Sequence, residues 1–329
     1  MITLADLQAA QARIRGVATR TRLIEFKGLC ADDPRHLYLK PENQQPIGAF
    51  KLRGAYNKIA ALTDEQRARG VISYSSGNHA QGVAYAARAL KTKAVIVMPD
   101  NAPTIKREAT AALGAEIVIV GPGSTERQLK AEALAAAHGY IIVPPYNDEF
   151  IIAGQGTMGL EILEDLPDVE TVLAPVGGGG MLAGIAAAIK LSKPSVKVIG
   201  VEPELSADAQ ASLRAGKIVS RSAEEVSRTL ADGLRTQSIG EINFAHFQRF
   251  VDDIITVTED EIREATRLLA GNPETTAEPS GAVATAGFLF HADELPQTLV
   301  NVAIVSGGNI DPALLAELRR SAKIATTRR

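Results

Sequence analysis

Short runs of apolar residues alternate along the chain with longer, alanine-rich segments. The clearest apolar runs are 94–98, 117–120, 172–176, 196–201 and 300–305. Near-continuous apolar runs of this length are typical of strands buried on both faces, as in parallel sheets. The alanine-rich segments 80–90, 104–113 and 181–191 have the length of helices. The alternation therefore predicts an α/β protein built from open, doubly wound, mostly parallel sheets.

Length and composition narrow the class of protein. The chain has 329 residues, which predicts two domains rather than one small core. A net charge of −3 and the absence of Trp argue against nucleic-acid binding. No apolar run is long enough to predict a membrane span. Cys30 is the only cysteine, which argues against a disulfide framework and favours the cytoplasm.

A single lysine stands among small and apolar residues in the segment Gly-Ala-Phe-Lys-Leu-Arg-Gly-Ala, residues 48–55. Such neighbours are expected to desolvate the amine of Lys51, and desolvation lowers the pKa of an amine. An amine with a lowered pKa can attack a carbonyl group and form a Schiff base. The alternative is an ordinary surface lysine at the start of a helix that begins near Phe50.

Two further segments join a strand to a helix through small residues. Ser75, Ser76, Gly77, Asn78 and His79 follow a short strand-like run, and Gly177 to Gly180 follow another. Backbone N–H groups at such a helix N-terminus can bind an anion, a carboxylate in the first case and a phosphate in the second. The alternatives are a helix cap formed by Asn78 and a flexible glycine turn.

The glycine segment also permits a dinucleotide interpretation. Gly178, Gly180 and Gly184 are spaced like a dinucleotide fingerprint, and Glu202 follows at the end of the next strand. That interpretation predicts a nicotinamide oxidoreductase, with the Glu202 carboxylate bound to a ribose hydroxyl.

Polar residues follow two other strands. Ser306 comes directly after the last apolar run, where a side chain in an open α/β sheet points into the ligand crevice. Glu202, Ser206 and Asp208 follow another strand and together offer oxygen ligands for Mg²⁺ or Mn²⁺. The alternatives are a plain turn at Ser306 and a solvated acidic loop at residues 202–208.

Together these segments resemble the fold-type II pyridoxal-phosphate enzymes, in the branch of serine/threonine dehydratases and serine racemase. The resemblance extends from Lys40-Pro41-Glu42-Asn43 to Ser306-Gly307-Gly308-Asn309, in the family's order. It implies a tryptophan-synthase-β-like fold and a homodimer. It also implies a large cofactor-binding domain (1–45 plus 146–329) and a small mobile domain (46–145). A nicotinamide enzyme needs neither the Lys51 segment nor Ser306, so the resemblance argues against that alternative.

The resemblance implies a role for individual residues, with Lys51 as the Schiff-base lysine. The implied residues for pyridoxal 5′-phosphate are Phe50, Lys51, Asn78, Gly177, Gly178, Gly179, Gly180, Met181, Glu278 and Ser306. The implied substrate residues are Ser75, Ser76, Gly77, Asn78, His79 and Arg127. The implied Mg²⁺ or Mn²⁺ ligands, as in racemase-like members, are Glu202, Ser206 through its carbonyl group, and Asp208.

The implied activity is that of an ammonia-lyase, which converts a small β-hydroxy amino acid such as threonine or serine to a 2-oxo acid and ammonia. Lys51 would remove the Cα proton. The neutral hydroxyl of Ser306, facing the ring nitrogen, favours prompt loss of the β-hydroxyl. Ser76 stands where many dehydratases have Ala, and a hydroxyl opposite Lys51 favours a racemase instead. Arg127, if not simply an exposed helix charge, would bind the second carboxylate of 3-hydroxyaspartate.

Overall fold

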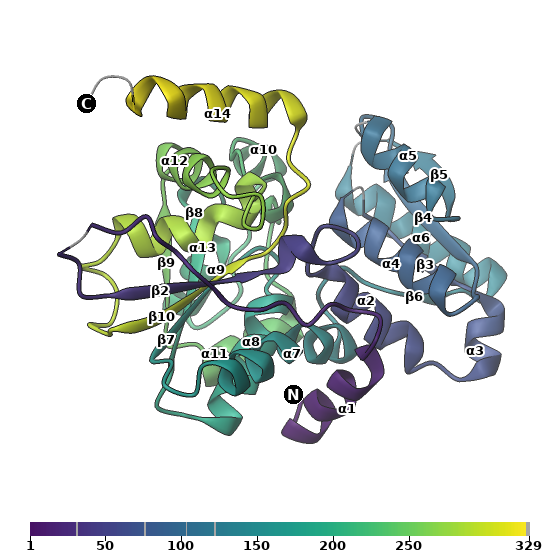
Figure 1. Cartoon of the computed structure of the whole chain (residues 1–329). Helices are drawn as coiled ribbons and strands as arrows, with labels where there is room; N and C mark the ends of the chain where they lie inside the picture. Colours follow the sequence, from purple (N-terminus) through teal and green to yellow (C-terminus); the bar gives the residue numbers. More distant parts are fainter. Residues whose placement is uncertain (31, 76, 103, 122, 327–329) are drawn as a thin grey trace.

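The computed structural model describes residues 1–30, 32–75, 77–102, 104–121 and 123–326. The chain forms two lobes, each built around a sheet with helices on both faces (Figure 1). The larger sheet has the order β1-β2-β10-β7-β8-β9, and the smaller sheet has the order β5-β4-β3-β6. Every pairing is parallel except that of β1 with β2. The predicted α/β fold with mostly parallel sheets is therefore confirmed.

The strands of the smaller sheet come from one continuous middle part of the chain, and the strands of the larger sheet come from before and after it. The larger sheet contains β1 (Ile24–Glu25), β2 (His36–Pro41), β7 (Thr171–Pro175), β8 (Lys197–Pro203), β9 (Asp253–Val257) and β10 (Val300–Val305). The smaller sheet contains β3 (Val71–Ser73), β4 (Ala94–Pro99), β5 (Glu116–Val120) and β6 (Ile141–Ile142). The boundaries predicted at 45/46 and 145/146, and the mobility of the small domain, stay predictions.

Alternating side chains of the large sheet enter two separate cores. Val172, Val302 and Ile304 pack with the helices on one face. Those helices are α1 (Leu4–Ile14), α7 (Glu149–Asp165), α8 (Gly180–Ser192) and α11 (Glu241–Phe250). Leu173 and Ala303 point to the opposite core, which contains α12 (Glu259–Leu269) and α13 (Pro279–Phe290). Burial on both faces explains why these strands are almost continuously apolar.

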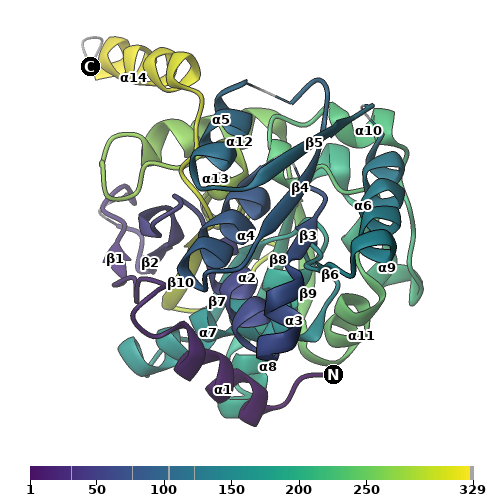
Figure 2. The same ribbon diagram turned by 90° about the vertical axis from the view of Figure 1, so that its right-hand side faces the viewer.

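The small lobe repeats this arrangement. The core on one face of its sheet includes residues of α2 (Lys51–Ala60) and α4 (Asn78–Ala89), and α6 (Ser124–His138) covers the other face. The remaining helices of this lobe are α3 (Asp64–Arg69) and α5 (Thr104–Ala112). Figure 2 shows the small sheet in front of the larger lobe, and Figure 1 shows α2 where the lobes meet. The helix that begins with Lys51 thus lies at the junction.

Other elements complete the larger lobe. They are the 3-10 turns η1 (Glu42–Gln44), η2 (Glu204–Ser206) and η3 (Asp232–Leu234), and the helices α9 (Asp208–Ala215), α10 (Ala223–Ser227) and α14 (Pro312–Thr326). In Figures 1 and 2 α14 extends from the side of the lobe. Throughout the part of the chain that the structure describes, no helix is both long and apolar enough to cross a bilayer.

The five apolar runs predicted as strands are confirmed as β4, β5, β7, β8 and β10, with shifts of one or two residues at some ends. The three predicted helices are confirmed as α4, α5 and α8. The sequence did not indicate β2 and β9, because β2 contains His36 and Lys40 and β9 begins with Asp253. These polar residues break the apolar pattern that identified the other strands.

Candidate active site

Lys51 is the first residue of α2, and its amine lies in an enclosed position. Its Nζ donates a hydrogen bond to the carbonyl oxygen of Pro145 at 2.7 Å and lies 5.2 Å from the centre of the Phe50 ring. Burial lowers the pKa of Lys51 to about 8. The desolvation expected from the sequence is present, and about half of the Lys51 side chains are neutral amines at that pH.

Lys51 is held against the last strand by backbone pairing across a long sequence separation. The Phe50 amide donates to the Ser306 carbonyl at 3.1 Å, and the Gly308 amide donates to the Gly48 carbonyl at 2.9 Å. Gly48 has a φ of +72°, a conformation that favours glycine. The Lys51 motif and the Ser306 turn, separate in the sequence, thus form one structural unit.

Close helix packing also fixes the start of α2. A Cβ atom on Gly82 of α4 would lie 3.2 Å from the Lys51 carbonyl. On the α7 side, a Cβ atom on Gly154 would lie 2.6 Å from the Cα of Gly54. Helices approach this closely only where glycine removes the side chain. The backbone around Lys51 is therefore confined between α4 and α7.

The glycine segment 177–180 is buried and tightly packed, so the flexible-turn alternative is wrong. A Cβ atom on Gly178 would lie 2.2 Å from the Tyr146 ring. The Gly178 carbonyl accepts hydrogen bonds from Asn243 Nδ2 at 2.5 Å and from the Gly240 amide at 3.1 Å. The segment leads into α8, whose first backbone N–H groups have no partner within the helix and suit an anion. Met181 lies buried in the first turn of α8.

A hydrogen-bond chain joins three of the predicted segments. Asn78 Nδ2 donates to Glu278 Oε1 at 2.6 Å, and Asn309 Nδ2 donates to Asn78 Oδ1 at 2.8 Å. Gly77, not Asn78, is the N-cap of α4, so the alternative that Asn78 caps its helix is wrong. Burial, followed by the nearby Asp232 carboxylate, raises the pKa of Glu278 to about 7. The Glu278 carboxyl group therefore titrates near neutral pH.

Ser306 lies at the carboxyl end of β10, where the sequence placed it. Its side chain is buried, and its hydroxyl donates a long hydrogen bond of 3.4 Å to the Ser280 carbonyl. Ser280 Oγ in turn accepts from the Gly233 amide at 2.8 Å. Ser306 thus brings a neutral hydroxyl to this edge of the sheet.

The described residues of segment 75–79 form hydrogen bonds through their side chains as well as their backbone. The imidazole of His79 is buried, and its Nε2 lies 3.0 Å from the Val143 carbonyl, so this nitrogen carries the proton. Burial, followed by repulsion from Lys51, lowers the pKa of His79 to about 3. The Ser75 hydroxyl accepts from the Gly77 amide at 3.4 Å. Ser76, the predicted second catalytic residue, lies outside the described residues.

Arg127 is placed on α6 and is half-buried. Its Nε is buried without a hydrogen-bond partner, and burial lowers the pKa of the guanidinium below its usual range. Within the described ranges, no hydrogen bond or ion pair joins Arg127 to the other predicted substrate residues. The structure therefore rejects the simple alternative of a fully exposed charge but does not bring Arg127 into the Lys51 unit.

Glu202 and Asp208 form a buried acidic pair. The Glu202 carboxylate accepts two backbone amides from the first turn of α9, at 3.1 and 2.9 Å. Both carboxylate oxygens of Asp208 are buried, and backbone amides approach them without completing a hydrogen bond. Burial raises the pKa of Asp208 to about 7, and burial together with Asp208 raises the pKa of Glu202. The alternative of a solvated acidic loop is therefore wrong.

The acidic pair is connected to the glycine segment. Ser206 Oγ donates to the Leu234 carbonyl at 3.0 Å, and a Cβ atom on Gly177 would meet Leu234 at 3.2 Å. Among the described residues, no group of three or more His, Cys, Asp and Glu side chains could hold a metal ion. A cation at the acidic pair would therefore need carbonyl and water oxygens as further ligands.

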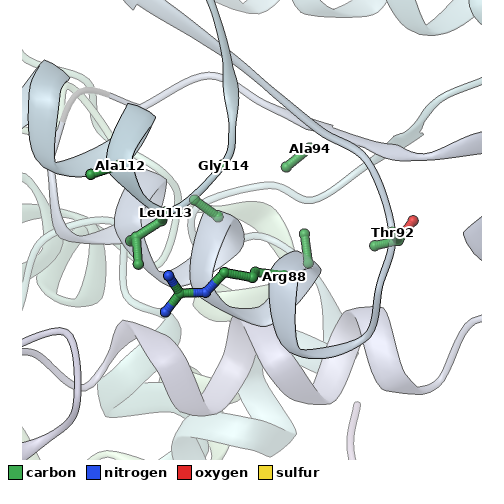
Figure 3. Close-up of a pocket in the computed structure, with 8 residues that line it drawn as sticks. Arg88, Thr92, Ala94, Ala112, Leu113 and Gly114 are labelled. Carbon is green, nitrogen blue, oxygen red and sulfur yellow. The ribbon is translucent and has the colours of Figure 1, made fainter.

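A separate hollow of about 180 Å³ lies inside the small lobe, between α4 and the end of α5 (Figure 3). Figure 3 shows Arg88 extending toward Leu113, with Ala94 and Thr92 on the other side. Of the described residues that line the hollow, only Arg88 is charged. The lining includes none of the predicted site residues that the structure describes.

Sequence reasoning missed two contributors to the site. The Pro145 carbonyl holds the Lys51 amine, and backbone groups carry no sequence signal for such a role. Arg53, two residues after Lys51, is fully buried in a cluster of charged groups. An arginine between Leu52 and Gly54, in a motif that otherwise consists of small and apolar residues, was the available signal.

The family model described as "Pyridoxal-phosphate dependent enzyme" matches residues 14–307. The chain belongs to this family. The resemblance inferred from the sequence motifs is thereby confirmed.

Characterised relatives cover nearly the whole chain. The L-threonine ammonia-lyase of Thermotoga maritima is 44% identical over 94% of this chain and 76% of its own length. The L-threo-3-hydroxyaspartate ammonia-lyase of Saccharomyces cerevisiae is 40% identical over 96% of each chain. The first name describes a single-carboxylate substrate, and the second describes a substrate with two carboxylates.

Solved structures have the same fold. The threonine deaminase of Solanum lycopersicum, in its processed form of isoform 2, matches with a TM-score of 0.89 and 37% identity, over 97% of this chain and 92% of that one. The serine racemase of Dictyostelium discoideum matches with a TM-score of 0.88 and 33% identity, over 94% of this chain and 99% of that one. Lyases and racemases thus share this architecture, so the fold alone does not select between them.

Proposed function

We propose that the protein is a pyridoxal-phosphate-dependent carbon–nitrogen lyase that converts a small β-hydroxy amino acid, such as L-threonine or L-serine, to a 2-oxo acid and ammonia. The observation that carries the proposal is the Lys51 amine, desolvated at the start of α2 and joined through its neighbour Phe50 to the Ser306 turn. The named activities of the ammonia-lyase relatives support it.

The described residues fit the cofactor. Lys51 offers a partly neutral amine, the glycine segment offers unpaired backbone N–H groups at the start of α8, and Ser306 offers a neutral hydroxyl. Pyridoxal phosphate, when bound, supplies an aldehyde for the lysine amine and an electron sink for the α-carbon of the substrate. Asn78 and Glu278 lie beside the turn that follows Ser306, because a Cβ atom on Gly307 would lie 2.4 Å from Glu278 Oε1 and 3.2 Å from Asn78 Nδ2.

Each residue has a task that follows from its chemistry. Lys51 accepts the Cα proton, because its lowered pKa makes the neutral amine available near pH 8. In this proposal the substrate carboxylate binds at the start of α4, where the first backbone N–H groups of a helix have no partner within the helix. Ser306 brings no negative charge, which favours rapid loss of a β-hydroxyl over a long-lived carbanion.

Absorption spectroscopy and product analysis test this proposal. The purified protein should show a band near about 410–420 nm that is lost in Lys51→Ala. It should release a 2-oxo acid from L-threonine or L-serine. Conversion of L-serine to D-serine without pyruvate would reject the lyase and favour the racemase alternative, in which Ser76 exchanges a proton on the face opposite Lys51.

A 3-hydroxyaspartate ammonia-lyase is the second candidate. The buried, unpartnered Nε of Arg127 favours it, because a guanidinium can bind a second carboxylate. The test compares how fast 2-oxo acids are released from serine, threonine and the diastereomers of 3-hydroxyaspartate. Arg127→Met should raise KM for 3-hydroxyaspartate at least about tenfold and leave that for threonine unchanged. An equal effect on both substrates contradicts this role for Arg127.

The acidic pair supports a proposed Mg²⁺ or Mn²⁺ site. A cation would offset the repulsion between the Glu202 and Asp208 carboxylates, and the unpartnered Asp208 oxygens would be its ligands. The Ser206 carbonyl is the proposed third ligand. Chelation that changes neither melting temperature nor activity would contradict the site.

The homodimer, the cytoplasmic location and the division into a large domain (1–45 plus 146–329) and a small mobile domain (46–145) belong to the same proposal. The two separate sheets support the division. Light scattering of the purified protein tests the dimer, and protease cleavage confined to residues near 45 and 145 tests the boundaries.

A further inference from the structure

Arg53 lies two positions after Lys51 and points to a different face of α2, because residues two apart on a helix do not face each other. Lys51 points toward the segment that contains Pro145, and Arg53 points toward α7. The arginine side chain has no exposed surface. α2 thus carries the reactive amine on one face and a fully buried cation on another.

Arg53 belongs to a cluster with Lys40, Glu42 and Glu161, here called the Arg53 cluster. Arg53 Nε and Nη2 donate to Glu42 at 2.8 and 2.9 Å. Its Nη1 and Nη2 donate to Glu161 at 2.7 and 2.9 Å. Lys40 Nζ donates to Glu161 at 2.7 Å. The cluster therefore contains two cations and two carboxylates, and its net charge is zero.

Neutral groups complete the hydrogen bonds of the cluster. The Thr21 hydroxyl donates to Glu42 at 2.8 Å, and Gln45 Nε2 donates to Glu42 at 2.9 Å. Arg53 also donates to the Thr157 hydroxyl at 3.1 Å and to the Thr19 carbonyl at 3.1 Å. Buried charges persist only when they are paired and hydrogen-bonded in this way.

The cluster connects the start of α2 to the larger lobe. Lys40 lies near the end of β2, Glu42 begins η1, and Glu161 lies on α7. The guanidinium is bound by carboxylates from two elements, and its planar, forked donors restrict both distance and orientation. A lysine at this position would keep the charge but would not reproduce that restriction.

We propose that Arg53 is a positioning residue for Lys51. Through the Arg53 cluster it sets the place and direction of the first turn of α2. Because the cluster has no net charge, burial is the only cause of the lowered pKa of Lys51 in the intact protein. This role rests on the proposed function, in which Lys51 is the reactive amine. It predicts that unbalancing the cluster shifts the protonation of Lys51 in a direction set by the sign of the charge left behind.

Other groups around Lys51 do not supply this control. His79 on α4 stays neutral because its pKa is lowered to about 3. Tyr146, in the loop after β6, stays neutral because burial and Asp208 raise the pKa of its hydroxyl. Glu278, at the N-cap of α13, accepts a hydrogen bond from Asn78, and its carboxylate is not among the causes of the lowered pKa of Lys51. α2 also carries Lys58, which pairs with Asp148 at 2.6 Å, but Lys58 lies two turns beyond Lys51, whereas the Arg53 cluster binds the first turn of α2.

The test measures the protonation of Lys51 in the full-length protein freed of cofactor. Limiting acetic anhydride acylates only the neutral amine, so the pH dependence of Lys51 acylation, read by peptide mass spectrometry, reports its pKa. The variants are Arg53→Met, Glu161→Gln, Arg53→Lys and the double variant Arg53→Met/Glu42→Gln. Ile262→Ala, on the buried face of α12, serves as a destabilised control that leaves the cluster intact.

Arg53→Met leaves a net negative charge and should raise the pKa of Lys51 by about one pH unit, whereas Glu161→Gln leaves a net positive charge and should lower it by about as much. The balanced double variant should return the pKa toward that of the unaltered protein. Arg53→Lys should keep the pKa but lower kcat at least about tenfold with little change in KM, because the orientation of the amine is lost.

The inference is overturned if every variant lowers the melting temperature, as Ile262→Ala does, while the midpoint of Lys51 acylation stays unchanged. Shifts in the same direction for Arg53→Met and Glu161→Gln would also overturn it. If Arg53→Met unfolds, Arg53→Gln, which also removes the charge but keeps a hydrogen-bond donor, takes its place. Failure of the proposed function would instead appear as absence of the cofactor band, with the opposite acylation shifts still present.

Discussion

Two groups of buried charged side chains in this protein differ in electrostatic balance. The Arg53 cluster pairs two cations with two carboxylates, and Arg53 and Lys40 lower the pKa of Glu161 despite its burial. Among the described residues, no buried cation is bonded to the acidic pair, and burial raises the pKa values of both Glu202 and Asp208. Burial raises the pKa of a carboxyl group in both places, but the net shift is downward where two cations are bonded to it and upward where none is.

The difference separates a structural role from a binding role. In the Arg53 cluster every charge has its hydrogen bonds within the protein, so the cluster can hold α2 without any ligand. At the acidic pair the Asp208 oxygens lack partners, so the protein alone leaves a carboxylate unsatisfied. An unsatisfied buried carboxylate indicates either a proton or a cation that the site accepts.

The largest effect is expected from removing one carboxylate of the Arg53 cluster. Glu42→Ala should lower the free energy of unfolding by about 3–5 kcal/mol, because Arg53 is left buried with too few partners. Urea unfolding measures the change. Glu164→Ala, which removes an exposed partner of Arg20, is the matched control and should cost no more than about 1 kcal/mol. Equal losses in the two variants would contradict the distinction between buried and exposed pairs.

A divalent cation should have the next largest effect, and only at the acidic pair. Mg²⁺ or Mn²⁺ at one hundred times its Kd should stabilise the protein by about 2.7 kcal/mol near pH 8. Calorimetry with and without the cation measures the gain. Asp208→Asn should abolish the gain, whereas Arg53→Lys should retain it. Stabilisation that persists in Asp208→Asn would place the cation elsewhere.

When no cation is present, removing a carboxylate from the acidic pair should stabilise the protein, whereas removing one from the Arg53 cluster should destabilise it. Asp208→Asn should raise the free energy of unfolding by about 1–3 kcal/mol near pH 8, because it removes a buried carboxylate that repels Glu202. A loss of stability in chelator would show that the Asp208 carboxylate is satisfied in the folded protein. Urea unfolding in chelator gives the answer.

The pH dependence of stability should also separate the two groups. The pKa of Asp208 rises from 3.8 to about 7 on folding, so its contribution is present below pH 3.8 and lost as pH rises through 7. The pKa of Glu161 is lowered, so its contribution is present above its usual 4.5 and lost as pH falls through the folded-state pKa. Difference curves against Asp208→Asn and Glu161→Gln should slope in opposite directions, and parallel curves would contradict this.

The smallest effect is expected at a partly exposed ion pair between the lobes. Lys106 on α5 bonds Asp232 in η3 at 2.5 Å. Lys106→Ala should change the free energy of unfolding by at most about 1 kcal/mol, because solvent screens the pair. A loss as large as that of Glu42→Ala would show that the contact between the lobes contributes more than its exposure indicates.

Much of the fold and part of the site could be predicted from local patterns. The apolar runs identified β4, β5, β7, β8 and β10, and the motif around Lys51 predicted its desolvation. The Arg53 cluster escaped prediction, because Lys40 and Glu161 lie 121 residues apart and Arg53 and Glu161 lie 108 apart. No local periodicity encodes which distant charges will meet.

The sequence by itself determined the fold class, the desolvation of Lys51 and the position of the glycine segment, because these depend on apolar periodicity and on backbone freedom within a few residues. The tertiary structure decided which charges are paired and which are not. It placed Arg53 among carboxylates, left Asp208 without a partner and joined Phe50 to Ser306 through the backbone. Electrostatic effects in a protein interior depend on three-dimensional surroundings that only the complete fold creates.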